Sequence, residues 1–435
     1  MSRVLVLLPL LLAVEYRVDL GPVSFMPSEL GLLVLIGAAL VTPPRNHRWL
    51  AERDELALTL CVGVLALVSV FFERDKTHAL SVYRDLMAPL VFYSLFVSVA
   101  LDRGQVLRLA KWFIVVATGT AALGLAQYAT GEYMWTLRPE DAVWQAFKTG
   151  LIRSFFLGEW LRTGSTLPAG LSATTNNFAS YLVIPTVGAF ALGWMRGTDS
   201  RRRLPWRLCF AVLTMALLLT FSRGSLLTLF MAAVVVTAFR KPHRIGPVQL
   251  AMVAAGGILV AAAIVASGAL SFDALGTVQG RVLMASAGRD LVMDHPGVLL
   301  TGGFTEDYHA RYYAEQVVHN LELYSVIQYG LPATAAWLLV VLLGLRKVYR
   351  VLRLADPEER AVAVSILAGI GVTVFVYAQT TSFVDNVQSS MWLFFWLGVG
   401  THLYRVTGAA TQRVAWVWVP RGTGLGAGSP AGASR

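Results

Sequence analysis

Two points in the chain combine a charged or polar side chain with long apolar neighbours. Arg223, in Ser222-Arg223-Gly224, separates the apolar runs 213–221 and 226–239, and His319-Asn320 directly precedes another apolar run. A charge at bilayer depth costs about 2.5–3.5 kcal/mol on an insertion scale, so we expect Arg223 in a turn at a membrane face. The planar fork of arginine suits phosphate or pyrophosphate. A histidine, with an ordinary pKa of about 6.5, suits proton acceptance at neutral pH.

Both residues also have purely structural interpretations. An arginine at a membrane interface often extends its charge toward lipid headgroups, and a histidine before a helix is commonly a solvated cap. In the turn around Arg223, we expect Gly224 to let the backbone bend tightly and Ser222 to cap the following helix. The residue types alone leave the catalytic and structural alternatives open.

A long polar segment later in the chain adds further basic side chains. Arg281 and Arg289 are eight residues apart, a little over two helical turns, so they would share one face of an amphipathic helix expected over 281–294. His295-Pro296-Gly297 would end this helix, because proline disfavours helical backbone before it. Gly302-Gly303 would then form a flexible turn.

Two more arginines stand where an outer membrane face is expected. Arg84 follows Ser81-Val82-Tyr83 near the outer end of an apolar run, and Arg162 precedes Thr163-Gly164-Ser165-Thr166. Each is either a structural charge or a substrate-binding group. We carry both forward as candidate binding residues, together with Arg289 and Asn320.

The sequence lacks the motifs of several common catalytic sites. It contains no H-E-x-x-H or D-x-D and only two cysteines, Cys61 and Cys209, which disfavours a metal site or a disulfide framework. It also contains no phosphate-cradling G-x-x-x-x-G-K-[ST] and no G-x-S-x-G nucleophile elbow. We therefore expect neither a metal nor a cofactor.

The composition indicates a polytopic membrane protein that is helical throughout. The chain has 435 residues, of which 56% are hydrophobic and 14% charged, whereas a soluble protein carries roughly 25% charged residues. Apolar runs recur at lengths near those of membrane spans. Twelve candidate spans are 4–14, 29–42, 56–72, 80–101, 109–130, 177–195, 206–221, 225–239, 247–270, 321–345, 361–381 and 387–404. The first two are short, and the first is expected to be a retained segment, not a cleaved signal, because no small-x-small site follows it.

The placement of basic residues gives an orientation. Alternate segments on one side of the twelve spans hold 24 of the 36 lysines and arginines, so the positive-inside rule puts both termini in the cytoplasm. Clusters such as Arg201-Arg202-Arg203 are then topology signals, and the net charge of +10 does not indicate a nucleic-acid partner. We expect one transmembrane domain over 1–420, with longer outer loops at about 131–176 and 271–320. Residues 421–435, rich in Gly, Ala and Ser, are expected to form a disordered cytoplasmic tail.

The motifs, taken in order, resemble the O-antigen ligase and polymerase superfamily of bacterial envelope glycosyltransferases. The resemblance covers roughly residues 155–350. It departs from the family pattern at Met284-Ala285, where a tryptophan is common, and at the adjacent glycines 302 and 303, where a glycine-x-glycine is usual; both departures bear on subfamily. The motifs that carry it are Arg162-Thr163-Gly164-Ser165-Thr166 with Asn176-Asn177, Phe221-Ser222-Arg223-Gly224-Ser225, Gly280-Arg281 with Asp294-His295-Pro296 and Gly302-Gly303, and His319-Asn320-Leu321-Glu322-Leu323 with Tyr329-Gly330-Leu331.

The resemblance implies transfer of a glycan from undecaprenyl-pyrophosphate to an acceptor hydroxyl at the periplasmic face of the inner membrane. The acceptor is lipid A-core for a ligase and another lipid-linked repeat unit for a polymerase, and neither a nucleotide sugar nor a metal is needed. His319 would be the general base, while Arg223 and Arg281 would stabilise the pyrophosphate leaving group. Asn320 would orient the base or the sugar, and a single displacement would invert the anomeric centre.

Two other classes of protein remain as alternatives. A transporter of lipid-linked oligosaccharide would also need outer arginines, although it would more often carry charges in the middle of its spans. A structural or assembly protein of the membrane is the third possibility. The sequence does not separate ligase from polymerase and does not name the glycan.

Overall fold

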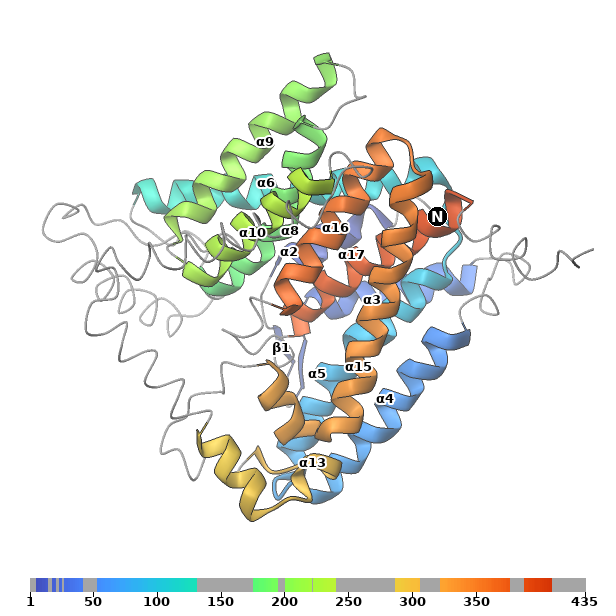
Figure 1. Ribbon diagram of the computed structural model, residues 1–435, viewed down its shortest axis with the longest axis vertical. Helices are drawn as coiled ribbons and strands as arrows, with labels where there is room; N and C mark the ends of the chain where they lie inside the picture. Colours follow the sequence, from blue (N-terminus) through green and yellow to red (C-terminus); the bar gives the residue numbers. More distant parts are fainter. Residues whose placement is uncertain are drawn as a thin grey trace, which may run out of the picture.

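The protein is a helical assembly with one short hairpin in the part of the chain that the structure describes. The computed structural model describes residues 5–14, 18–20, 23–25, 27–41, 53–130, 175–194, 200–220, 222–239, 286–305, 321–375 and 387–408. The helices are α2 (Leu7–Ala13), α3 (Pro27–Val41), α4 (Arg53–Phe72), α5 (Lys76–Ser98), α6 (Arg103–Thr130), α8 (Thr175–Trp194), α9 (Ser200–Leu219), α10 (Arg223–Phe239), α13 (Val298–Thr301), α15 (Leu321–Leu354), α16 (Pro357–Phe375) and α17 (Val387–Val406), with a further helical stretch at 286–294 (Figure 1).

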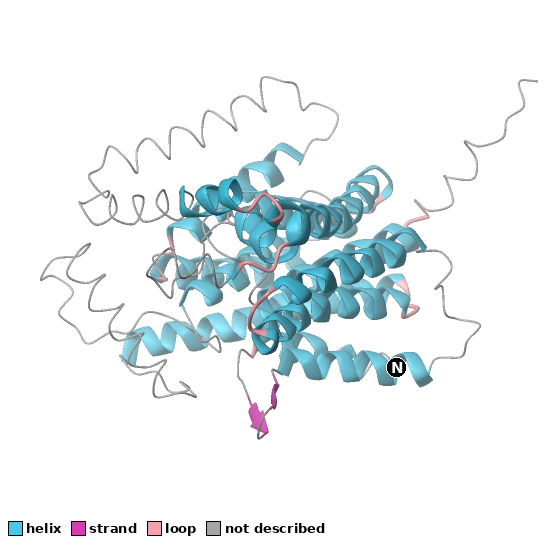
Figure 2. Cartoon of the chain, turned by 90° about the horizontal axis from the view of Figure 1, so that it is seen from below, coloured by secondary structure: helices cyan, strands magenta, loops and turns pink. Residues whose placement is uncertain are grey.

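The hairpin is a small exception to the all-helical prediction. Strands β1 (Val18–Leu20) and β2 (Val23–Phe25) pair antiparallel, with Val18 opposite Phe25, and project from the helical body (Figure 2). In each strand two apolar residues flank a polar one, and Gly21-Pro22 between them is a turn-forming pair. Strands of three residues are too short for a search for apolar periodicity to detect.

Eleven of the twelve predicted apolar runs coincide with helices, and the remaining run, 247–270, lies outside the described residues. So do most of the loop predicted at about 131–176 and the whole tail 421–435. Four helical stretches in the described part are long and apolar enough to cross a membrane. They are Lys76–Ser98, Arg103–Thr130, Asn177–Trp194 and Tyr324–Arg353, and shorter apolar stretches are Pro27–Gly37, Leu56–Phe72 and Ser225–Thr237. These lengths agree with a membrane protein but do not establish twelve spans.

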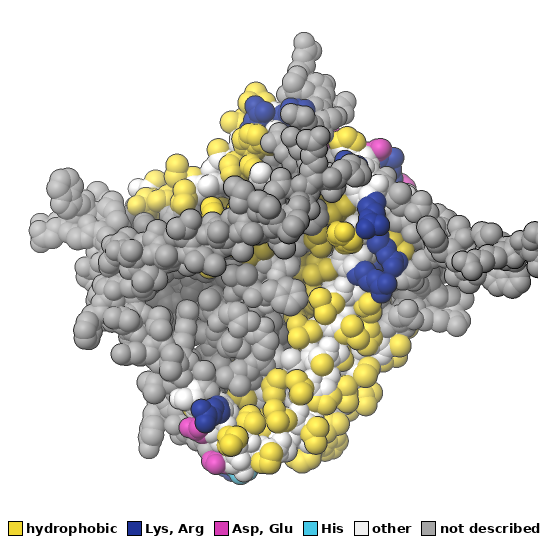
Figure 3. Space-filling view, viewed as in Figure 1, with side chains coloured by type: hydrophobic (Ala, Val, Ile, Leu, Met, Phe, Trp, Pro, Cys, Tyr) yellow, Lys and Arg dark blue, Asp and Glu magenta, His cyan; other side chains and the backbone are white. Residues whose placement is uncertain are grey.

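The outer surface of α4 is apolar, as expected for a helix that faces lipid. Leu60, Val64 and Phe71 recur at intervals of four and seven residues and are 60%, 67% and 74% exposed. Side chains so spaced lie on one helical face. Figure 3 shows hydrophobic side chains spread over the face formed by α4 and α15, with Lys and Arg gathered toward one end of it. Contiguous exposed apolar surface of this kind is unusual on a soluble protein.

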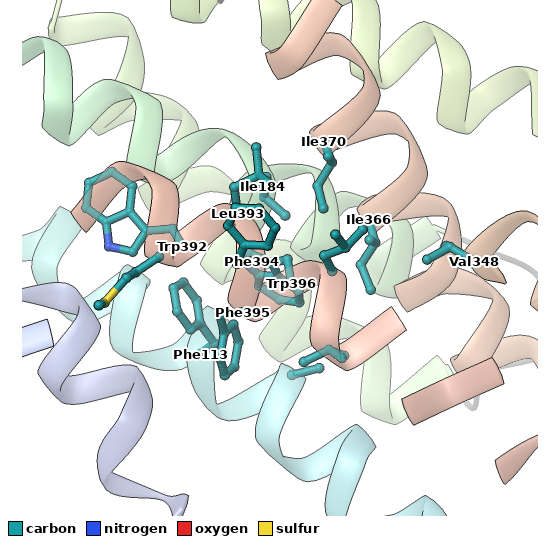
Figure 4. Packing of buried hydrophobic residues seen from close by; sticks show 14 of the residues in the cluster. Phe113, Ile184, Val348, Ile366, Ile370, Trp392, Leu393, Phe394, Phe395 and Trp396 are labelled. Carbon is teal, nitrogen blue, oxygen red and sulfur yellow. The ribbon is translucent and has the colours of Figure 1, made fainter. Parts of the chain in front are cut away.

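The main core is built around α17, which packs against α5, α6 and α8. Phe395 stacks on Phe96 at 5.5 Å and on Phe113 at 4.8 Å between ring centroids, and Trp396 meets Phe113 edge-on (Figure 4). Such aromatic pairs each contribute about 0.5–1.5 kcal/mol beyond the area they bury. Gly398 permits this packing, because a Cβ there would lie 2.9 Å from a ring carbon of Phe96.

Candidate functional site

The segment 286–305 covers the ends of α4 and α15 and belongs to the region where the sequence predicts a site (Figure 1). Leu291, Val298, Tyr324 and Ile327 form a small buried cluster that is separate from the main core. The helix expected over 281–294 is confirmed for its described part, 286–294, and it ends before Pro296 as predicted. This cluster fixes the segment to the first turns of α15.

The Gly302-Gly303 turn is tightly packed, so the prediction of a flexible turn was wrong. Both residues have positive φ, 63° and 78°. A Cβ at Gly302 would lie 2.5 Å from the carbonyl carbon of Tyr329, and a Cβ at Gly303 would lie 2.9 Å from the Glu73 nitrogen. The Gly303 N–H donates to the Gln328 carbonyl at 3.0 Å. Glycine is required here because two backbones touch, which sequence spacing alone does not reveal.

Gly330 is the matching residue on α15. Its φ of 81° and ψ of 161° interrupt the helix, and this backbone region is essentially restricted to glycine. A Cβ at Gly330 would lie 2.6 Å from the Leu300 carbonyl oxygen. The Tyr329 hydroxyl, next to the interruption, donates to the Val82 carbonyl of α5 at 3.2 Å. The kink in α15 is therefore held from two sides, by the 286–305 segment and by α5.

A buried carboxylate links the same segment to the turn between α4 and α5. Glu73 is 3% exposed, and its Oε2 accepts a hydrogen bond from the Thr305 N–H at 3.0 Å. Lys76 Nζ donates to the Val70 and Phe71 carbonyls at the end of α4, and Asp75 caps α5 by accepting from Thr77 N at 2.8 Å. The turn is thus anchored to both of its own helices and to the 286–305 segment.

Arg84 lies about two turns farther along α5 and is held by two carboxylates. Its Nε and one Nη donate to Asp85 Oδ1 at 3.1 and 3.0 Å, and its Nε is 3.7 Å from Glu29 Oε1 in the first turn of α3. The Arg84 side chain is 38% exposed, and Asp85 is buried. The structure gives Arg84 a structural role, as the counter-ion of Glu29 and Asp85. Its role in substrate binding stays a prediction.

The structure describes only some of the other predicted site residues. Arg289 is exposed on the helical stretch 286–294. Arg223 is the first residue of α10, so the prediction that Arg223 and Gly224 form the turn between two spans was wrong, because the helix already begins at Arg223. Ser222, beside Arg223, is buried, and its Oγ is 3.1 Å from Ser225 Oγ. Four predicted site residues lie outside the described part of the chain: Arg162, Arg281, His319 and Asn320. The proximity of His319, Arg281 and Arg223 therefore stays a prediction.

The structure adds three polar residues that sequence reasoning missed. Gln328, Ser325 and Thr305 are 4%, 4% and 1% exposed. Both amide atoms of Gln328 and the two hydroxyls find no hydrogen-bond partner within the described residues. A buried polar group without a partner costs about 1–3 kcal/mol, so these side chains mark a place where water or a polar ligand is to be expected. For Ser325 and Gln328, the position shortly after His319-Asn320 was the available signal, but each residue alone is unremarkable on an apolar helix.

Comparison with known proteins does not assign a family. No protein-family model matches the chain, and no curated protein matches it. The argument for function therefore depends on the residues and on the contacts between them.

Proposed function

We propose that this protein is a multi-pass glycosyltransferase of the bacterial inner membrane, similar in function to O-antigen ligases. It transfers a glycan from undecaprenyl-pyrophosphate to an acceptor hydroxyl at the periplasmic face, with lipid A-core as the favoured acceptor. The observation that carries the proposal is the contact between Gly302-Gly303 and Tyr329-Gly330. These belong to two separate motifs of the resemblance, and their direct packing makes the described parts of these motifs one structural unit.

The proposal includes twelve spans with both termini in the cytoplasm. It is supported by contacts between segments that the charge alternation assigns to the same side. On the outer side, Glu73 meets Thr305 and Arg84 meets Glu29. On the cytoplasmic side, Lys111 at the start of α6 pairs with Glu358 of α16 at 2.7 Å. A misassigned span would bring residues from opposite sides together.

The chemistry that we propose at this site is a single displacement. His319 accepts the proton of the acceptor hydroxyl as its oxygen forms a bond to the anomeric carbon. The bond between the anomeric carbon and the pyrophosphate oxygen breaks, and undecaprenyl-pyrophosphate leaves. Arg223 and Arg281 stabilise the charge that develops on this leaving group. Asn320 orients the reacting groups, and Arg289, Arg162 and Arg84 bind the donor or acceptor.

Transfer by the purified protein tests the proposal. In detergent, with a lipid-linked glycan, an acceptor and neither ATP nor an ion gradient, a glycosyltransferase forms the new product with multiple turnovers. A transporter forms none, and that result would contradict the proposal. The alternative within the superfamily, a polymerase, gives a different product: glycan chains extended on the lipid carrier, without transfer to lipid A-core. A deletion strain separates the two, because loss of the ligase leaves core without polymer and loss of the polymerase leaves a single repeat on the core.

A further inference from the structure

A cavity of about 600 Å³ opens between the residues directly before α2 and the first turns of α6, far along the chain from the proposed catalytic residues. Its walls are largely apolar: Leu5, Val6, Leu101, Leu109, Trp112 and Val115. Two cationic side chains and one amide complete the lining, Arg108, Lys111 and Gln105. Its volume falls in the range of small-molecule sites, about 300–1,000 Å³.

The cavity lies at one end of a helix that is long enough to cross a membrane. α6 begins at Arg103. At about 1.5 Å rise per residue, Arg108 is roughly 7 Å into the helix and Val115 roughly 18 Å. Gln105 and Arg108 thus stand near the helix end, Leu109 and Lys111 follow them, and Trp112 and Val115 extend the lining toward the middle of the span. A phospholipid with its phosphate at Arg108 would have the apolar residues Leu109, Trp112 and Val115 along its acyl chain.

The two cations differ in how they are compensated. Lys111 Nζ pairs with Glu358 Oε2 at 2.7 Å. Arg108 is exposed, and its Nε donates to the Gly104 carbonyl at 3.2 Å. Within the described residues, Arg108 forms no ion pair with a carboxylate. Among the described residues, the rim of the cavity therefore carries a positive charge with no carboxylate partner, one helical turn from a second cation.

The wall formed by Leu5 and Val6 and the helix α2 that follows them are held in place at two points. Trp112 Nε1 donates to the Val6 carbonyl at 2.9 Å, and Trp392 Nε1 of α17 donates to the Leu12 carbonyl. Val6 and Val115 nevertheless stay 43% and 42% exposed. An acyl chain lying against them would remove this apolar surface from the exterior while its phosphate reaches Arg108.

We propose that this cavity binds one anionic phospholipid, with its phosphodiester at Arg108 and an acyl chain along Val6, Leu109 and Val115. The site is independent of the glycan transfer proposed above. It lies near the N-terminal end of α6, where Lys111 pairs with Glu358 in the first turn of α16. The Gly302-Gly303 unit instead contacts the first part of α15. Binding of an anionic lipid here stabilises the packing of the short α2 segment against α6.

Native mass spectrometry of the full chain in detergent tests the proposal. The probes are dioleoylphosphatidylglycerol, which is anionic, and dioleoylphosphatidylethanolamine, which has no net charge. We expect the wild-type protein to retain one phosphatidylglycerol in preference to phosphatidylethanolamine. Arg108→Gln should weaken phosphatidylglycerol binding about fivefold, which corresponds to loss of one cation near an anionic headgroup. Arg108→Lys should keep most of the binding.

A matched control and a second variant complete the design. Arg346→Ala removes an exposed arginine of α15 that does not line the cavity, and it should leave binding unchanged. Val115→Trp fills the apolar part without altering any charge and should reduce retention of both lipids, whether or not Arg108→Gln yields folded protein. Equal binding of the two lipids to the wild type, equal losses in Arg108→Gln and Arg346→Ala, or full retention in Val115→Trp would each overturn the proposal.

Discussion

Replacing Gly302 with alanine tests the close backbone contact around which the proposed site is built. Alanine at φ 63° and ψ −156° occupies a region that is essentially restricted to glycine, at a cost of about 1–3 kcal/mol. Its Cβ would lie 2.5 Å from the Tyr329 carbonyl carbon. That carbon belongs to the main chain at the kink, so relief requires α15 to move, and such overpacking costs about 1–3 kcal/mol more. We expect a total of about 2–6 kcal/mol.

Hydrogen exchange provides the measurement, because the loss is expected to be local. The Gly303 N–H, which donates to the Gln328 carbonyl, should exchange at least about 30-fold faster in Gly302→Ala, since 2 kcal/mol corresponds to that factor. Gly297→Ala is the matched control: its φ is −58° and nothing lies within 4 Å of an added Cβ. Equal exchange rates and equal melting temperatures in the two variants would refute the role assigned to the contact.

Three further predictions address the charges of the proposed site. Arg223→Ala and Arg281→Ala should weaken donor binding as well as turnover, since pyrophosphate is charged before and during the reaction. Lysine at either position should restore little of the loss, because a point charge lacks the bidentate fork. Donor titration measures the binding, and single-turnover rates measure the chemical step. Transfer should survive EDTA without added divalent cation, and activity that returns only with magnesium would contradict this. Arg84→Gln should lower stability by about 1–2 kcal/mol in a thermal-shift assay, because it removes the guanidinium that donates two hydrogen bonds to buried Asp85; the double variant with Asp85→Asn should recover most of the loss.

The positions of the helices were predictable from the sequence, but their ends were less so. The apolar run at 109–130 predicted α6, which begins six residues earlier, at Arg103. Asp102 and Gln105 explain the difference: the Gln105 N–H donates to Asp102 Oδ1 at 2.8 Å, and the Asp102 N–H donates to Gln105 Oε1 at 2.9 Å. This reciprocal cap is visible in the sequence as an acid and an amide three residues apart. A search for apolar runs passes over it because both residues are polar.

The contacts that build the candidate site were less predictable, because they join residues far apart in the chain. Glu73 and Thr305 are separated by 232 positions, and Gly302 meets Gly330 across the boundary between two motifs. The sequence marked Gly302-Gly303 as a turn but carried no signal that Gly330 would pack against it. Gln328 was hidden for a similar reason, since its amide, which has no hydrogen-bond partner among the described residues, becomes notable only when its burial is known.

Glycan transfer by His319→Ala, measured per folded molecule, tests the central claim most directly. Wild-type and variant proteins are purified in detergent, quantified as monodisperse species, and supplied with an undecaprenyl-pyrophosphate-linked glycan and lipid A-core. If His319 is the general base of a glycosyltransferase, the variant should bind the donor normally and turn over about 10²–10⁴-fold more slowly. A variant that folds in lower yield but transfers glycan at the wild-type rate would remove His319 from the mechanism. Absence of transfer by the wild-type protein would contradict the proposed function itself.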